Sequence, residues 1–139
     1  MNIEVQETAD RLLNRIGVST CSFTTVKAAK RTLEEEGVCV LSMQEPHWEL
    51  EPGKTYLVTQ SDSSLFAFSI GCQFLAEEAA DDGQMLRLAA AHTDHPCLYI
   101  KSNPEVDTKG YGKLNVEVYG GAILNTWLDR ALSVAGKVV

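Results

Sequence analysis

Residues 89–101 read AAAHTDHPCLYIK and hold the densest set of chemically reactive side chains in this chain. An apolar run, residues 85–91, leads into them, and its aliphatic composition predicts a buried strand. His92 and Asp94 follow that run two positions apart. Because side chains at i and i+2 of an extended backbone point to the same side, we expect the imidazole and the carboxylate to lie together. Their place at the carboxyl end of a strand is where open α/β sheets bind ligands.

An imidazole beside a carboxylate is suited to binding zinc. A neutral imidazole nitrogen is a common zinc ligand, and a carboxylate behind the ring fixes its tautomer and orientation. The spacing alone also fits a solvated turn or a local hydrogen bond. His92 is therefore a candidate metal ligand, and Asp94 is a candidate catalytic residue that orients it.

The surroundings of this pair resemble a known family. The run AHTDHPCL, residues 91–98, resembles the signature A-H-T-D-S-P-x-L of the M18 family of aminopeptidases, in the aspartyl-aminopeptidase group. Other segments resemble further motifs of the family, in the family's order. They are residues 48–53, Tyr56 and residues 63–71 in its N-terminal pattern, residues 119–121 in its Y-G-G-G motif, and residues 126–136 in its W-F-D-R-D-L-S-L-A-G-R-V segment. The resemblance covers the chain from about residue 19 onward.

The resemblance implies an α/β fold and a peptidase. Residues 1–102 are expected to be the N-terminal part of a zinc-aminopeptidase catalytic domain, a mixed sheet flanked by helices. Residues 103–139, where the pattern changes to strands only, are expected to begin a β-rich dimerisation domain that makes the protein a homo-oligomer. The implied activity is removal of N-terminal Asp or Glu from peptide substrates at a two-zinc site.

In that site, His92 would bind one zinc and Asp94 would orient the imidazole. By the resemblance, the remaining ligands lie beyond residue 139, where the chain stops inside an apolar run. We therefore expect an N-terminal fragment that is inactive by itself.

The chain departs from the family at several positions. His95 replaces the usual serine and is read as a rim residue, although it offers another metal contact. Cys97 leaves open an alternative H-x-x-H-x-C zinc site with His92 and His95. Gln60 replaces an arginine, so no catalytic role is assigned to it. Asp129-Arg130 is read as a structural ion pair rather than as catalytic.

The composition indicates which classes of partner and which cellular compartment to expect. A net charge of -7 with scattered basic residues argues against nucleic acid as a partner. No apolar run is long enough to span a membrane, and the N-terminus is too acidic for a signal peptide. The four cysteines form no C-x-x-C pair and indicate reduced thiols in a cytoplasmic protein.

Periodicity and turn signals predict the elements along the chain. Helical spacing predicts helices over residues 5–16, ended by Gly17, and 24–36, ended by Gly37. Turns are expected at Ser61-Asp62-Ser63, Asn103-Pro104 and Lys109-Gly110. The expected strands are residues 38–41, 55–59, 65–70, 98–100, 114–119 and 132–134. Residues 131–139 are also expected to pair as an exposed strand with another chain.

Three functions are compatible with these observations. The first is a fragment of a metallo-aminopeptidase. The second is a binding or assembly module that has lost its catalytic half, and the third is a small structural zinc domain. A coding sequence that continues past residue 139 with the missing acids would favour the first. A genuine stop codon after residue 139 would favour the second, and tight, stoichiometric zinc in the isolated chain would favour the third.

Overall fold

The computed structural model describes residues 3–72 and 87–138, which divide into two compact units. The first unit holds the described residues up to Asp94 and those after Val134, and the second unit is His95–Val134. In chain order the elements are α1 (Ile3–Val18), α2 (Ser22–Glu35), β1 (Cys39–Val40), β2 (Thr55–Gln60), β3 (Ser64–Ser69), β4 (Cys97–Thr108), β5 (Tyr111–Tyr119) and the short 3-10 helix η2 (Leu124–Thr126).

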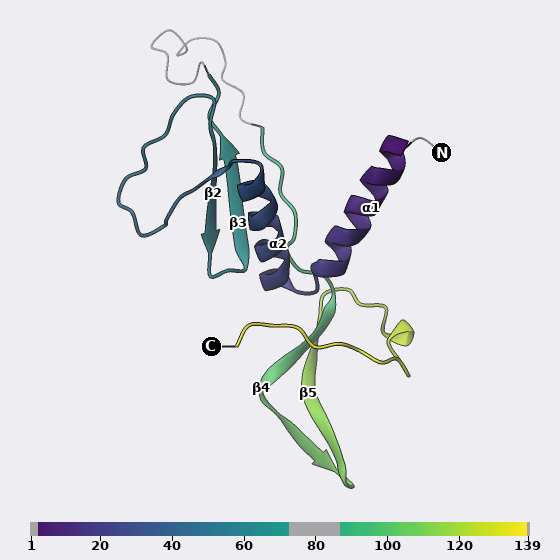
Figure 1. The fold of residues 1–139 in the computed structure, drawn as a ribbon. Helices are drawn as coiled ribbons and strands as arrows, with labels where there is room; N and C mark the ends of the chain where they lie inside the picture. The colour runs from purple at the N-terminus through teal and green to yellow at the C-terminus, as the bar shows by residue number, and fades with distance from the viewer. Residues whose placement is uncertain (1–2, 73–86, 139) are drawn as a thin grey trace. The chain divides into compact units, whose positions relative to one another are not determined.

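The sheet of the first unit is mixed, with strand order β1-β2-β3. Strand β1 runs parallel to β2, and β3 runs antiparallel to β2 in a hairpin from Thr55↔Ser69 to Gln60↔Ser64. Helix α2 packs against β2 and β3 (Figure 1). This arrangement confirms the α/β class and the mixed sheet flanked by a helix.

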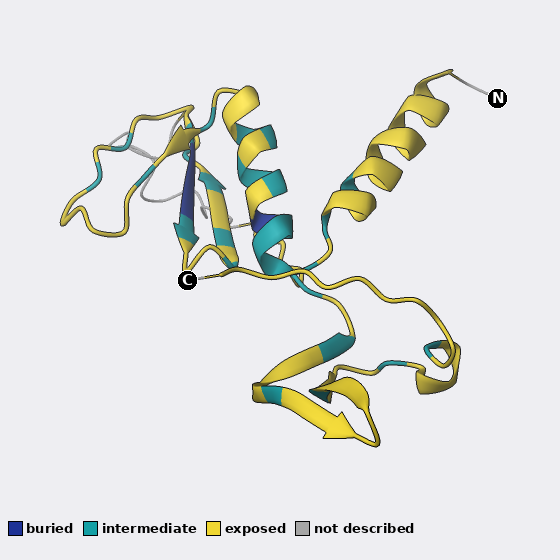
Figure 2. Ribbon diagram, turned by 60° about the horizontal axis from the view of Figure 1, so that its bottom comes forward, coloured by how far each residue is buried: buried dark blue, intermediate teal, exposed yellow. Residues whose placement is uncertain are grey.

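The core of the first unit is centred on β2. Its residues Tyr56, Leu57 and Val58 are buried, as is Val26 of α2, whereas most of the remaining surface is exposed (Figure 2). Three consecutive buried positions are typical of a central strand that is covered on both faces. The aromatic ring of Phe68 on β3 stacks against Tyr56 with ring centroids 5.6 Å apart, which extends the core across the hairpin.

Both helices form where periodicity predicts them. The i,i+4 pairs Lys30–Glu34 and Arg31–Glu35 are present on α2, and Gly37 follows it with a φ of 82°. Helix α1 has no buried residue, and it continues through Gly17 to Val18. Arg15 joins the two helices, since its guanidinium donates hydrogen bonds to the Ala28 carbonyl at 2.8 Å and the Thr32 hydroxyl at 2.7 Å.

The second unit contains the antiparallel β4–β5 hairpin. The predicted Lys109-Gly110 turn is confirmed, with φ values of 54° and 79°. The turn predicted at Asn103-Pro104 is wrong, because both residues lie inside β4, where the register shifts between Ile100 and Glu105. A proline has no N–H to donate, so an irregularity of the ladder tolerates it where regular pairing does not.

Two predicted strands are absent from the described residues. Residues 87–91 are exposed and lie outside any strand, while residues 85 and 86 lie outside the described residues. Leu132 and Val134 are likewise exposed and form no strand, nor does any of residues 131–138. Alternation and aliphatic composition produce a strand only where a neighbouring strand supplies the hydrogen bonds. Whether residues 131–139 pair with a strand of another chain stays a prediction.

The prediction of an ion pair between Asp129 and Arg130 is also wrong. Although both residues are described, their side chains form no salt bridge. The Arg130 guanidinium instead donates to the Thr126 carbonyl at 3.3 Å, one turn back along the chain. Asp129 has a φ of 56°, which is the left-handed backbone conformation and not that of an extended strand.

No described helix is long and apolar enough to cross a membrane.

Substitution of Gly120 tests the packing of the second unit. Its φ is 77°, and an added Cβ would lie 3.3 Å from Pro96. Gly120→Ala should therefore lower the stability of the unit by about 1 kcal/mol or more. The measurement is amide hydrogen exchange of the β4–β5 hairpin. Gly121→Ala is the matched control, because a Cβ there meets nothing within 4 Å. Equal exchange in the two variants would contradict the packing of Gly120 on Pro96.

Candidate metal centre

His92 and Asp94 lie together, although the residues before them form no strand. The distance from His92 Nδ1 to Asp94 Oδ1 is 3.1 Å. Between them, the Thr93 hydroxyl donates a 2.8 Å hydrogen bond to the Ser63 carbonyl. The backbone bends at Thr93 and is not an extended strand, so the expected contact between the imidazole and the carboxylate is present without the strand alternation from which it was expected.

The two members of the pair differ in exposure. The His92 side chain is 85% exposed, whereas the Asp94 side chain is only 19% exposed. In the neutral tautomer that donates Nδ1–H to the carboxylate, His92 keeps the lone pair of Nε2 for a metal. A held carboxylate behind an accessible imidazole is the arrangement that orients a zinc ligand.

The His92–Asp94 pair fits one ligand position of a zinc site, together with the acid that orients that ligand. Zinc is usually held by four ligands, or by three protein ligands and a water. Among residues 3–72 and 87–138, no three His, Cys, Asp or Glu side chains gather closely enough to hold a metal ion. The described residues thus contribute one candidate ligand, His92, with its orienting acid.

His95 and Cys97 belong to the second unit. The ring nitrogen Nδ1 of His95 lies 3.2 Å from the Pro96 carbonyl, and its side chain is exposed. Cys97 is the first residue of β4.

The turn that accepts the hydrogen bond of Thr93 also makes a charged contact. Lys137 Nζ lies 2.6 Å from Asp62 Oδ2, and the hydrogen bond and charge of Lys137 lower the pKa of the Asp62 carboxyl. Ser61 and Asp62 have φ values of 53° and 56°, the left-handed conformation that a tight hairpin turn requires. The sequence predicts the turn, but neither of its long-range contacts.

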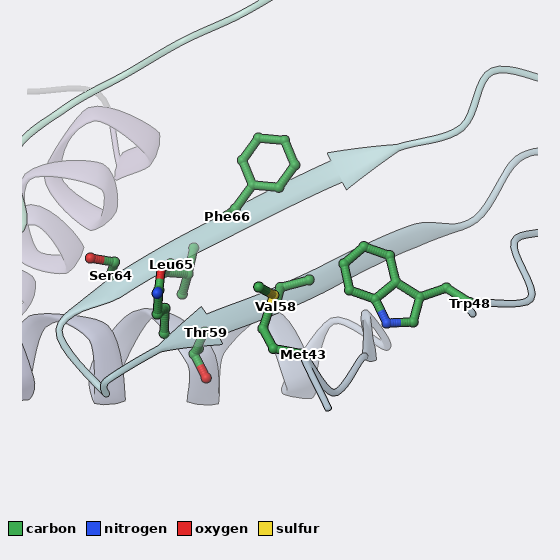
Figure 3. Close-up of a pocket in the computed structure, with 8 residues that line it drawn as sticks. Met43, Trp48, Val58, Thr59, Ser64, Leu65 and Phe66 are labelled. Carbon is green, nitrogen blue, oxygen red and sulfur yellow. The ribbon is translucent and has the colours of Figure 1, made fainter. Parts of the chain in front are cut away.

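An apolar cavity of about 270 Å³ lies beside the same hairpin (Figure 3). The Trp48 indole forms one wall and is fixed by a 2.8 Å hydrogen bond from Nε1 to the Ser42 carbonyl. The lining consists of Met43, Trp48, Val58, Thr59, Gln60, Ser64, Leu65 and Phe66. The sequence did not indicate the cavity, because its walls come from separate segments.

Sequence reasoning also missed the environment of Cys21, which precedes α2. Partial burial raises the pKa of the Cys21 thiol, but hydrogen bonds from Thr24 outweigh it and lower the pKa below its usual value. The Thr24 hydroxyl lies 3.6 Å from Cys21 Sγ.

Comparison with known proteins places the His92–Asp94 pair in a recognised domain. Residues 16–139 match a family model described as "Aminopeptidase I zinc metalloprotease (M18)". A "Probable M18 family aminopeptidase 2" of Stutzerimonas stutzeri (strain A1501) is 42% identical over 127 residues, covering 91% of this chain. A "Probable aspartyl aminopeptidase" of Ricinus communis is 36% identical over 128 residues, covering 92% of this chain.

Solved structures of similar proteins share the fold. The structure described as the "Cryo-EM structure of the Ape4 and Nbr1 complex" matches 88% of this chain with a TM-score of 0.76 and 33% identity. That of Chaetomium thermophilum mApe1 matches 86% with a TM-score of 0.67 and 27% identity. The chain spans 28% and 25% of the two curated relatives and 22% and 26% of the two solved chains.

Proposed function

Because this chain belongs to the M18 family of zinc aminopeptidases, we propose that it is the N-terminal part of an enzyme that removes acidic N-terminal residues from peptides. The observation that carries the proposal is the His92–Asp94 pair, with its 3.1 Å contact, inside the segment that matches the family model. The preference for Asp or Glu is supported by the similarity to a probable aspartyl aminopeptidase.

In this proposal, His92 would hold one zinc through Nε2, and Asp94 would keep the imidazole in the required tautomer and orientation. When bound, zinc would supply Lewis-acid polarisation of a peptide carbonyl and a lowered pKa for a bound water. The high exposure of His92 leaves its ring accessible, while the lower exposure of Asp94 limits competition from solvent for its carboxylate.

Residues 1–139 by themselves are proposed to be inactive. Their described part brings no third metal-binding side chain to His92 and Asp94, and one ligand with one orienting acid does not hold a two-zinc site. We further propose a homo-oligomer. We also propose a cytoplasmic location, because cysteines kept as thiols suit a reducing compartment. The division into residues 1–102 of a catalytic domain and 103–139 of a β-rich dimerisation domain belongs to the same proposal.

Expression of the complete coding region of the gene tests the activity. We expect the product to hydrolyse Asp- and Glu-p-nitroanilide faster than Leu-p-nitroanilide. A chelator should abolish the activity and added zinc should restore it, whereas residues 1–139 expressed alone should hydrolyse none of the three substrates. Failure of the complete product on all three would contradict the proposed function, and faster cleavage of the leucine substrate would contradict the acidic preference.

A further inference from the structure

We propose that Thr93 is a positioning residue, which anchors the His92–Asp94 pair to the β2–β3 turn (residues 60–64) and so holds the imidazole in its metal-binding orientation. This inference rests on the proposed function for the role of His92. Thr93 itself contacts neither metal nor substrate in the proposal, and it acts only through its two neighbours.

The anchor matters because, among the described residues, the segment is not part of a sheet. Residues 87–96 form no strand, so no ladder of backbone hydrogen bonds fixes their direction. His92 is almost fully exposed, so packing does not hold its ring either. The hydrogen bond from Thr93 Oγ1 to the Ser63 carbonyl is 2.8 Å long and partly buried, and it joins residues 30 positions apart. It therefore ties the segment to the sheet.

The turn is suited to serve as that anchor. It closes the only described hairpin of the first unit, and β2 in that hairpin carries the buried core residues. Ser61 and Asp62 are both held at positive φ, a conformation that non-glycine residues keep where the surroundings determine it. The Asp62 carboxylate additionally holds Lys137, so two distant segments meet on this one turn.

The geometry assigns different tasks to the two sides of the segment. The Thr93 side chain faces the turn, and the side chains of His92 and Asp94 meet each other at 3.1 Å. With the Thr93 hydroxyl bound, the peptide units on either side of Thr93 are fixed and the pair stays in register. Without it, these peptide units can rotate, and the Nδ1–Asp94 contact is lost for part of the time.

Thr93→Val and Thr93→Ser test this. Valine matches the shape of threonine without its hydroxyl, and serine keeps the hydroxyl. The first readout is the neutral tautomer of His92 in residues 1–139, measured by long-range ¹H–¹⁵N NMR. We expect Thr93→Val to lower the Nδ1–H population and Thr93→Ser to retain it. In the complete protein, the zinc dissociation constant should rise about 10- to 100-fold in Thr93→Val and stay near the wild-type value in Thr93→Ser.

Urea unfolding of both variants in a Trp127→Phe background, followed by Trp48 fluorescence, shows whether the first unit remains folded. An unchanged His92 tautomer in Thr93→Val would overturn the inference. So would equal losses in the valine and serine variants, because the hydroxyl would then not be the cause. A tautomer that responds only to valine, in a protein whose complete form cleaves no peptide, would support the positioning role while contradicting the proposed function.

Discussion

The complete protein carrying His92→Ala should lose its bound zinc and its peptidase activity together. His92 is the only member of the pair that can offer a neutral, exposed ring nitrogen to a metal, and alanine removes it. Asp94→Asn should behave differently, because Asp94 lies behind the ring. It should leave most of the zinc bound and reduce turnover about 10- to 100-fold, the usual cost of losing an orienting partner.

Zinc content and kcat of the purified variants separate the two roles. His47→Ala is the matched control, since His47 is an exposed histidine of the same unit. It should keep zinc and activity at wild-type values. Equal zinc loss in His92→Ala and Asp94→Asn would show that Asp94 is itself a ligand.

Leu57→Ala should be the most damaging single truncation for the folding of the first unit. Leu57 lies on β2 and is 0% exposed, and it is the one fully buried large side chain among the described residues. Truncation to alanine removes the three carbon atoms beyond Cβ and leaves a cavity in the core around β2. Substitutions of this kind cost about 2–5 kcal/mol.

Urea unfolding of residues 1–139 measures that cost. Leu88→Ala is the matched control, because Leu88 is 74% exposed and the same atoms are removed. Its midpoint should stay close to that of the wild type, while the midpoint of Leu57→Ala falls well below it. Coincident midpoints for the two variants would mean that β2 does not carry the core.

The local elements could be predicted from the sequence because their causes are local. The spacing of Val5, Leu12 and Ile16 specifies α1 by the period of the helix. The Lys109-Gly110 turn follows from the backbone freedom of glycine beside a residue that tolerates positive φ. Neither prediction needs knowledge of a distant residue.

The errors arose where a distant partner decides the structure. Leu132 and Val134 alternate with smaller residues but have no neighbouring strand among the described residues, so alternation alone misled. Asn103-Pro104 has the composition of a turn, yet the pairing of β4 with β5 keeps it within a strand.

In the candidate site, too, the local contact could be predicted from the sequence and the long-range contact could not. The i, i+2 spacing predicted that His92 and Asp94 lie side by side, and the 3.1 Å contact agrees. The anchor of Thr93 on Ser63 could not be predicted, because nothing in the sequence marks two residues 30 positions apart as partners. The roles of His92, Thr93 and Asp94 in the enzyme are predictions that the variants described above test.

The two tryptophans of the chain are distributed one to each compact unit. Trp48 stacks near Phe68, with ring centroids 6.4 Å apart, and Trp127 follows η2 in the second unit. The protein therefore carries a separate optical reporter in each half. Trp127→Phe leaves an emission signal from the first unit alone, and Trp48→Phe leaves one from the second. Comparing the two denaturation curves reveals whether the halves melt in one cooperative step or in succession.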